Sequence, residues 1–263
     1  MPDTHRTTLA GLAADLHGTS DARPAVVLLH GLSYDRRQWG PLLAELETVD
    51  PGRRVLALDL PGHGGSAPRP TYHAAEVAEQ LHEAVTQAGL GAPVVVGHSL
   101  GGVLATVYAA AYPATAVVNI DQPLLAGPFR DLLLQAEPTL RGPAFGEVWD
   151  RLLQGMGTDL LPPDARTLVE TATTPRQDLL LGYWDELLTT PADELTRQRV
   201  RDMESLRARG VAYHHVSGME PAASYRDWLL TVLPGAEVTV LTDSGHFPHL
   251  VRAREVAGIV AAA

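Results

Sequence analysis

One serine stands between two glycines in the sequence GHSLG, residues 97–101, directly after a row of valines and before a helical pattern. The form G-x-S-x-G in this context predicts a sharp strand-to-helix turn that exposes a nucleophilic serine, here Ser99. Gly97 and Gly101 suit that turn because a side chain at either position would clash with the strand or the helix. The helix N-terminus behind the turn favours negative charge. Ser99 is therefore predicted to act as a nucleophile.

A serine hydroxyl is a poor nucleophile unless a base removes its proton, and the chain has eleven histidines to choose from. His246, in SGHFPHL, follows the last predicted strand on a glycine loop, at the end of the sheet where Ser99 is expected. We predict that His246 is the base. His249 is expected to be a surface or packing residue, His98 to point away from the nucleophile, and His63 to lie in a turn.

A tetrahedral intermediate needs hydrogen-bond donors for its oxyanion. In LLHGLS, residues 28–33, a buried strand ends at His30 and Gly31, where the glycine lets the backbone approach a substrate. We expect the N–H of Leu32 to join the N–H of Leu100 as the two donors, with Gly31 against the substrate. His30 is expected to support this loop rather than to transfer protons.

The elements that must hold these residues are short apolar runs of strand length, alternating with helical patterns. Such alternation predicts an α/β fold with a mostly parallel central sheet flanked by helices. The runs are 25–30, 54–60, 93–98, 116–121, 211–216 and 237–242, and the opening residues are predicted to add one or two antiparallel edge strands. Between 124 and 209 we find only helical segments. The domains predicted are a core of residues 1–123 and 210–263 and a helical lid insertion of residues 124–209.

Composition excludes several chemistries. The 263 residues include no cysteine and no lysine, which rules out thiolate nucleophiles, sulfur-bound zinc, Schiff bases and a phosphate-loop lysine. The histidines show no H-x-x-x-H spacing on one helix, so we expect no metal and no cofactor.

Charge and hydropathy point to the kind of partner. The net charge is -11 and the arginines are scattered, so neither nucleic acid nor an anionic membrane is an expected partner. No signal-peptide pattern or membrane-length apolar run is present, which predicts a cytoplasmic protein. We expect a small-molecule substrate and a monomer or homodimer.

Four motifs, HGLS, DLPGHGGS, GHSLGG and SGHFPHL, occur in the order and approximate spacing of the α/β-hydrolase fold family, which the chain resembles over nearly its whole length. The resemblance implies the fold and a helical lid. It also implies the nucleophile and base roles for Ser99 and His246, and the oxyanion roles for Leu32 and Leu100.

The acid of the triad has two candidates. Most of the family carries it after the strand that follows the lid, where VSGMEPAASY offers Glu220. A minority, including haloalkane dehalogenases and fungal zearalenone lactonases, carries it at the end of the strand before the lid, where VVNIDQP offers Asp121. Burying a carboxylate without a partner lowers the free energy of unfolding by roughly several kcal/mol. A partner such as His246 would therefore explain an aspartate at this position. We favour Asp121, with Glu220 as the alternative.

The lactonases look similar in further respects: chain length, an acid followed two residues later by proline, HFP after the final strand, and a tryptophan late in the lid that Trp184 matches. The chain departs from them in GHSLG and in having Glu220. The lid is rich in leucine and large aromatic residues, which implies an apolar or aromatic substrate portion, and Trp184 is the residue assigned to substrate contact.

Together these residues predict a cofactor-free serine hydrolase that cleaves a carboxylic ester or lactone through an acyl-enzyme intermediate. The same constellation serves other reactions. The alternatives are a C–C bond hydrolase or lyase that uses the same triad, and a ligand receptor of this fold with little turnover.

Overall fold

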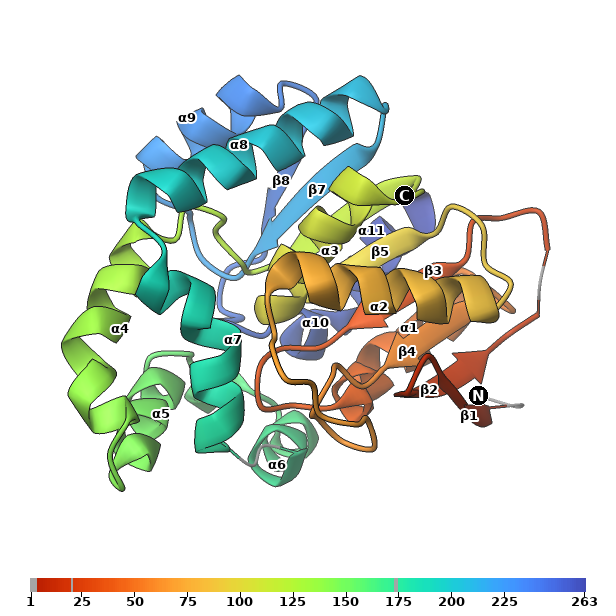
Figure 1. Ribbon diagram of the computed structural model, residues 1–263. Coiled ribbons are helices and arrows are strands. Elements are labelled where there is room, and N and C mark those ends of the chain that lie inside the picture. The colour runs from red at the N-terminus through yellow and green to blue at the C-terminus, as the bar shows by residue number, and fades with distance from the viewer. Residues whose placement is uncertain (1–3, 20, 173–174) are drawn as a thin grey trace.

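A computed structural model describes residues 4–19, 21–172 and 175–263, and these form an eight-stranded sheet of order β1-β2-β4-β3-β5-β6-β7-β8. The strands β1 and β2 pair antiparallel and join β4 antiparallel, and the remaining strands run parallel. Figure 1 shows this twisted sheet through the middle of the molecule. The predicted fold class, including the antiparallel edge strands, is confirmed. The strands are β1 (His5–Leu9), β2 (Leu12–His17), β3 (Val26–Leu29), β4 (Val55–Leu58), β5 (Val94–His98), β6 (Ala116–Ile120), β7 (Ala212–Ser217) and β8 (Glu237–Val240).

Both faces of the central strands are buried, which is why these strands read as continuous apolar runs. Val27 and Leu29 belong to a cluster with α2 (Ala74–Gln87) and α3 (Leu100–Ala111). Val26 and Leu28 point to the opposite face, with α1 (Gly40–Val49) and α11 (Ala253–Ala262). Successive residues of one strand thus supply two separate cores.

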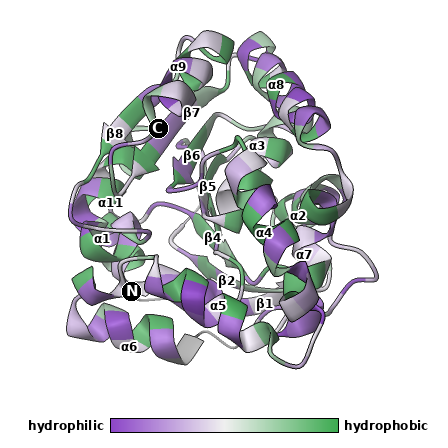
Figure 2. Ribbon diagram, turned by 90° about the vertical axis from the view of Figure 1, so that its left-hand side faces the viewer, coloured by the Kyte–Doolittle hydropathy of each residue, from purple (hydrophilic) through white to green (hydrophobic). Residues whose placement is uncertain are grey.

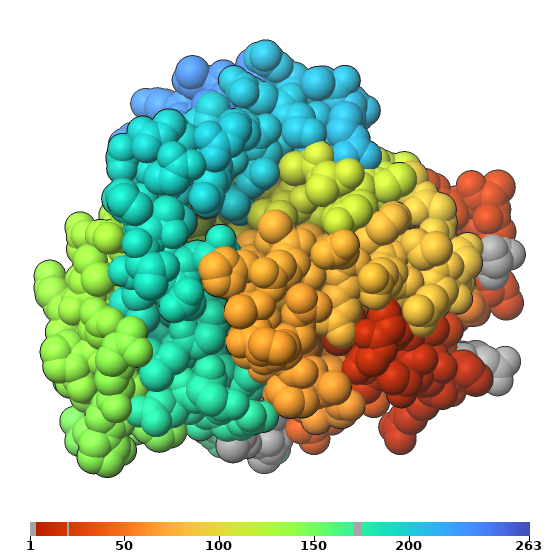
Figure 3. Space-filling model, in the orientation of Figure 1, coloured from red at the N-terminus to blue at the C-terminus, as the bar shows by residue number. Residues whose placement is uncertain are grey.

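Between β6 and β7 the described residues form only helices, and we keep the name lid for residues 124–209. Figures 1 and 3 show α4 to α7 gathered on one side of the molecule, in green to teal, with α8 leading back along the core. The lid helices mix hydrophilic and hydrophobic residues, as Figure 2 shows for α5 and α6. They are α4 (Gly127–Leu140), α5 (Phe145–Gln154), the 3-10 turn η2 (Thr158–Leu160), α6 (Pro163–Ala172), α7 (Gln177–Thr189) and α8 (Ala192–Ala208).

Shorter elements complete the core. The 3-10 turn η1 (Arg36–Trp39) follows β3, α9 (Ala223–Val232) follows β7, and α10 (Pro248–Val251) follows β8. In the part of the chain that the structure describes, every helix is too short or too polar to cross a lipid bilayer.

Candidate active site

The turn at Ser99 joins β5 to α3, and it has the strained backbone that the sequence predicts. Ser99 has φ 51° and ψ −122°, a region that non-glycine residues rarely occupy. A Cβ built on Gly97 would lie 1.9 Å from the carbonyl oxygen of Gly101, and one on Gly101 would lie 2.1 Å from the carbonyl oxygen of Leu29. Strand and helix therefore approach too closely for any side chain. The Ser99 N–H donates to the carbonyl of Ile120 at 3.0 Å, which ties the turn to the end of β6.

His246 and Asp121 form a hydrogen-bonded pair at the carboxyl ends of the strands. The Nδ1 of His246 lies 2.7 Å from Oδ2 of Asp121, and both side chains are largely buried. The other carboxylate oxygen accepts from the Gly218 N–H at 2.9 Å and the Ser217 hydroxyl at 3.2 Å. Burial by itself would raise the pKa of Asp121, but the hydrogen bonds from His246, Gly218 and Ser217 outweigh it and hold the pKa below its ordinary value. Asp121 is thus suited to orient a histidine as a carboxylate.

Glu220, the alternative acid, lies elsewhere. Its side chain is 66% exposed in the loop after β7 and pairs with Arg226 at 2.9 Å. The structure therefore brings Asp121, rather than Glu220, to the imidazole of His246. The hydroxyl of Ser99 makes no hydrogen bond to another described residue. Nucleophile–base hydrogen bonds are often long before substrate binds.

The loop after β3 lies directly against Ser99. A Cβ built on Gly31 would lie 3.4 Å from the Cβ of Ser99 and 3.0 Å from Nδ1 of His98. Within residues 4–19, 21–172 and 175–263, the N–H groups of Leu32 and Leu100 donate to no other group. The two predicted oxyanion donors are therefore unengaged, one in each of the two segments that meet at the serine.

Two buried histidines support this loop. His30 donates from Nδ1 to the carbonyl of Gly31 at 2.7 Å and accepts from the Leu60 N–H at 2.9 Å. His63 accepts from the Ser33 N–H at Nε2 at 3.1 Å and donates from Nδ1 to the carbonyl of Pro61 at 3.0 Å. Burial lowers the pKa of His30 to about 4 and that of His63 to about 3, so both rings are neutral at pH 7. Sequence reasoning predicted the support by His30 and missed that by His63.

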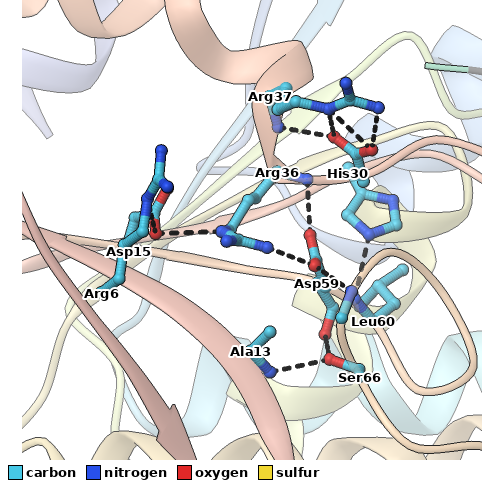
Figure 4. Close-up of polar contacts among 11 residues, drawn as sticks. Arg6, Ala13, Asp15, His30, Arg36, Arg37, Asp59, Leu60 and Ser66 are labelled. Carbon is cyan, nitrogen blue, oxygen red and sulfur yellow. Dashed lines mark hydrogen bonds and ion pairs between the residues drawn. The ribbon is translucent and has the colours of Figure 1, made fainter.

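A polar network links the loops after β3 and β4, as Figure 4 shows. The buried carboxylate of Asp59 accepts from the backbone N–H of Arg36 at 2.8 Å and also pairs with the Arg36 guanidinium. The Asp59 carbonyl accepts from the hydroxyl of Ser66 at 2.7 Å, which in turn accepts from the Ala13 N–H at 2.9 Å. Residues of the DLPGHGGS motif therefore hydrogen-bond to the loop after β3 and hold it in place.

His98 and His249 are both fully buried, and the ring of His98 lies 4.7 Å from that of His246, between centroids. His98 donates from Nε2 to the backbone carbonyl of His246 at 2.7 Å. The ring of His249 lies 4.3 Å from that of His98 and 4.9 Å from that of Trp39, between centroids. Burial lowers the pKa of His249 to about 3. The contact of His98 with the base was not predicted, because a hydrogen bond to a backbone carbonyl 148 residues away leaves no pattern in the sequence.

A cavity of about 840 Å³ opens onto the histidine–aspartate pair. Asp121, Gly245 and His246 form part of its wall, and α4, α5 and the segment after α5 form most of the rest. Trp184 is not among the lining residues: it is buried against Phe129, with ring centroids 5.7 Å apart in an edge-to-face arrangement. The apolar lining side chains are Leu132, Ala136, Val148, Leu152, Met156, Leu160 and Met219.

Chemically, the arrangement offers a strained serine, a histidine whose Nδ1 is held by a carboxylate, and two N–H donors. The cavity beside the histidine has both apolar and polar lining side chains, and Ser99 is not one of its lining residues. Within the described chain, no three His, Asp or Glu side chains converge as metal ligands.

Known proteins with similar sequences carry out different reactions. The chain is 28% identical to a pimeloyl-[acyl-carrier protein] methyl ester esterase of Vibrio vulnificus strain YJ016 over 254 residues, which is 91% of this chain and 94% of the esterase. It is 39% identical to a 2-succinyl-6-hydroxy-2,4-cyclohexadiene-1-carboxylate synthase of Salmonella paratyphi C over 79 residues, which is 30% of each chain.

Solved structures show the same fold. A variant of AqdC, studied for recognition and ring cleavage of the Pseudomonas quinolone signal, aligns with a TM-score of 0.79 at 20% identity, covering 99% of this chain and 98% of that one. E-2-(acetamidomethylene)succinate hydrolase aligns with a TM-score of 0.72 at 19% identity, covering 99% and 98%. A family model described as the alpha/beta hydrolase family matches residues 26–259. Because that match spans most of the sequence, the chain belongs to the α/β hydrolase family, whose members similar to it include named esterases and hydrolases.

Proposed function

We propose that the protein is a serine hydrolase that cleaves a carboxylic ester or lactone with an apolar or aromatic portion. Ser99 attacks the carbonyl carbon, His246 takes the hydroxyl proton and returns it to the leaving alcohol, and Asp121 holds the imidazole in the required tautomer. The N–H groups of Leu32 and Leu100 stabilise the oxyanion. Water, deprotonated by His246, then releases the acyl group from Ser99.

The observation that carries the proposal is the hydrogen bond between His246 and Asp121 at the end of the sheet where Ser99 lies half-buried on the turn between β5 and α3. A buried carboxylate on Nδ1 leaves Nε2 as the proton acceptor, which a serine nucleophile requires. Further support comes from the similarity to a methyl ester esterase across 91% of the chain. The apolar side chains of the cavity wall support an apolar substrate portion, and Glu147 and Arg151 on α5 add charged groups to the same wall.

The test is hydrolysis of p-nitrophenyl acetate, butyrate and octanoate and of an aromatic macrolactone by wild type and by Ser99→Ala. We expect Ser99→Ala to lower kcat on the order of 10⁴-fold or more while circular dichroism shows an unchanged fold. We also expect kcat/KM to rise with acyl length, by roughly fourfold per added methylene that the cavity buries. Hydrolysis that survives in Ser99→Ala would refute the proposal.

A second candidate is cleavage of a C–C bond, and it has one specific observation in its favour. Three structures described for ring cleavage of the Pseudomonas quinolone signal align over at least 98% of the chain with TM-scores of 0.74 to 0.79. In a hydrolytic cleavage, His246 held by Asp121 would deprotonate a water molecule that adds to a substrate ketone, and the C–C bond would break as the same proton is returned to the leaving carbon, without covalent attack by Ser99. Turnover of the Pseudomonas quinolone signal that persists in Ser99→Ala and disappears in His246→Ala would favour this candidate over the ester hydrolase.

A further inference from the structure

The backbone of His246 is held by two segments besides the acid that holds its ring. Its carbonyl accepts from His98, which belongs to the nucleophile strand, at 2.7 Å. Its N–H donates to the carbonyl of Met156, which belongs to the lid, at 2.8 Å. His246 is therefore held by three hydrogen bonds, to Asp121, His98 and Met156. Met156 lies in the lid, which the sequence predicted only to cover the substrate.

The lid contacts the loop that carries His246 through two glycines, Gly157 of the lid and Gly245 of the loop. A Cβ built on Gly157 would lie 3.2 Å from Cα of Gly245, and one on Gly245 would lie 2.7 Å from the carbonyl oxygen of Met156. Both glycines have positive φ, 72° and 53°. Gly245 also contacts Gly218: a Cβ built on Gly218 would lie 1.7 Å from the carbonyl oxygen of Gly245. Gly218 is the residue whose N–H holds Asp121. Gly157 of the lid therefore packs against Gly245, which precedes His246, and Gly245 packs against Gly218, whose N–H holds Asp121.

The lid also holds the residue that follows the base. Phe247 is fully buried, and it clusters with Leu161 next to η2 and with Ala165 and Val169 of α6. Because Gly245 and Phe247 flank the histidine, the lid contacts the chain on both sides of it. Residues 155–157 also line the cavity, so a bound substrate would press on the same segment.

We infer that lid residues 155–157 form a positioning element for the base: their seating on Gly245 sets the orientation of His246 toward Asp121, so the lid contributes to the chemical step as well as to substrate selection. This inference rests on the proposed function for its kinetic test. A segment that only selected substrate would have no need to take the N–H of His246 or to require glycine at two facing positions.

The test compares Gly157→Ala with Gly52→Ala. Both glycines have φ 72°, a value that L side chains rarely adopt, but a Cβ at Gly52 meets nothing within 4 Å whereas one at Gly157 meets Gly245. We expect Gly157→Ala to lower kcat at least about tenfold with KM changed less than twofold, and Gly52→Ala to leave both constants unchanged. A change confined to KM would overturn the inference.

The same two substitutions are then made in the Asp121→Asn background. If the lid acts by aligning His246 with Asp121, Gly157→Ala will change kcat less than twofold there, because the alignment it disturbs is already lost. An equal loss in both backgrounds would mean a general structural effect and would contradict the inference. Should Gly157→Ala fail to fold, Leu161→Ala loosens the lid beside Phe247 without backbone strain and is expected to give the same pattern, with Leu188→Ala on α7 as its control.

A readout that needs no turnover separates this inference from the proposed function. The Nδ1 proton of His246, shared with Asp121, is observed by ¹H NMR as a downfield resonance, assigned by its loss in His246→Ala. We expect Gly157→Ala to shift or broaden it and Gly52→Ala to leave it unchanged. If wild type shows no Ser99-dependent hydrolysis, the proposed function fails while this measurement still decides the role of the lid: an unchanged resonance in Gly157→Ala would refute it.

Discussion

At the residue scale, the sequence predicted Ser99 because it lies on a glycine turn directly after a buried apolar strand, and His246 because it lies on a glycine loop after the last predicted strand. It left the acid open between two positions, and burial was the argument that favoured Asp121. The structure has that aspartate buried and hydrogen-bonded to His246, whereas Glu220 is exposed. The contacts of His246 with His98 and Met156 could not be predicted, because they involve backbone atoms that every residue type possesses.

The two carboxylates can be separated by isosteric amides. Asp121→Asn keeps the shape but presents the wrong partner to Nδ1, so we expect kcat for a p-nitrophenyl ester to fall about 10⁴-fold, as the wrong histidine tautomer does in a serine triad. Glu220→Gln removes only an exposed ion pair with Arg226, and we expect its kcat within twofold of wild type. Equal, small losses in both variants would contradict the assignment of the acid.

At the scale of elements, the strands were predictable and the lid helices were less so. The run 25–30 corresponds to β3 (Val26–Leu29) and the run 93–98 to β5 (Val94–His98), because a strand buried on both faces must be apolar throughout. Helix α4 shows the difficulty in the lid: Pro138 would be expected to end a helix, yet α4 continues to Leu140. The proline lies in the last turn, where few further hydrogen bonds are lost.

The approach of β5 and α3 gives a prediction at this scale. In Gly97→Ala the new methyl group would lie 1.9 Å from a backbone oxygen, which no side-chain movement can relieve. We expect the free energy of unfolding, measured by urea titration with circular dichroism, to fall by about 3 kcal/mol or more. Gly146→Ala on α5 meets nothing within 4 Å, and we expect a free energy of unfolding unchanged or raised by up to about 1 kcal/mol. Similar effects of the two substitutions would contradict this account of the turn.

At the scale of the whole molecule, buried histidines make stability depend on pH. Burial lowers the pKa of His30 and His215 to about 4, those of His63 and His249 to about 3, and that of His98 well below its ordinary value. In the unfolded chain each takes up a proton near pH 6.5. As pH falls from about 6.5 toward about 4, the unfolded chain binds more protons than the folded one, so the free energy of unfolding must decrease.

We therefore expect urea titrations to give a constant free energy of unfolding above about pH 7 and a steep decrease below about pH 6.5, with a slope of up to about 1.4 kcal/mol per pH unit for each histidine. His249→Phe is the matched variant, because neither of its ring nitrogens has a hydrogen-bond partner among the described residues. This variant should reduce the slope of the free energy of unfolding against pH by the contribution of one histidine, up to about 1.4 kcal/mol per pH unit. A free energy of unfolding that is constant between pH 7.5 and pH 5 would contradict the neutral, buried state of these rings.

The loop after β7 shows how this molecule could change its specificity over evolution. Because Asp121 at the end of β6 contacts His246, that loop supplies only the backbone N–H of Gly218 and the hydroxyl of Ser217 to the pair. From Met219 onward it is exposed, and Met219 itself lines the cavity with a side chain that is 62% exposed. Because the Ser217 hydroxyl contacts this wall, among the described residues, only at the backbone carbonyl of Met219, substitutions of side chains in the wall leave the hydrogen bonds of the pair in place. Residues 219–222 are accordingly the segment to randomise first in a directed-evolution library for new substrates.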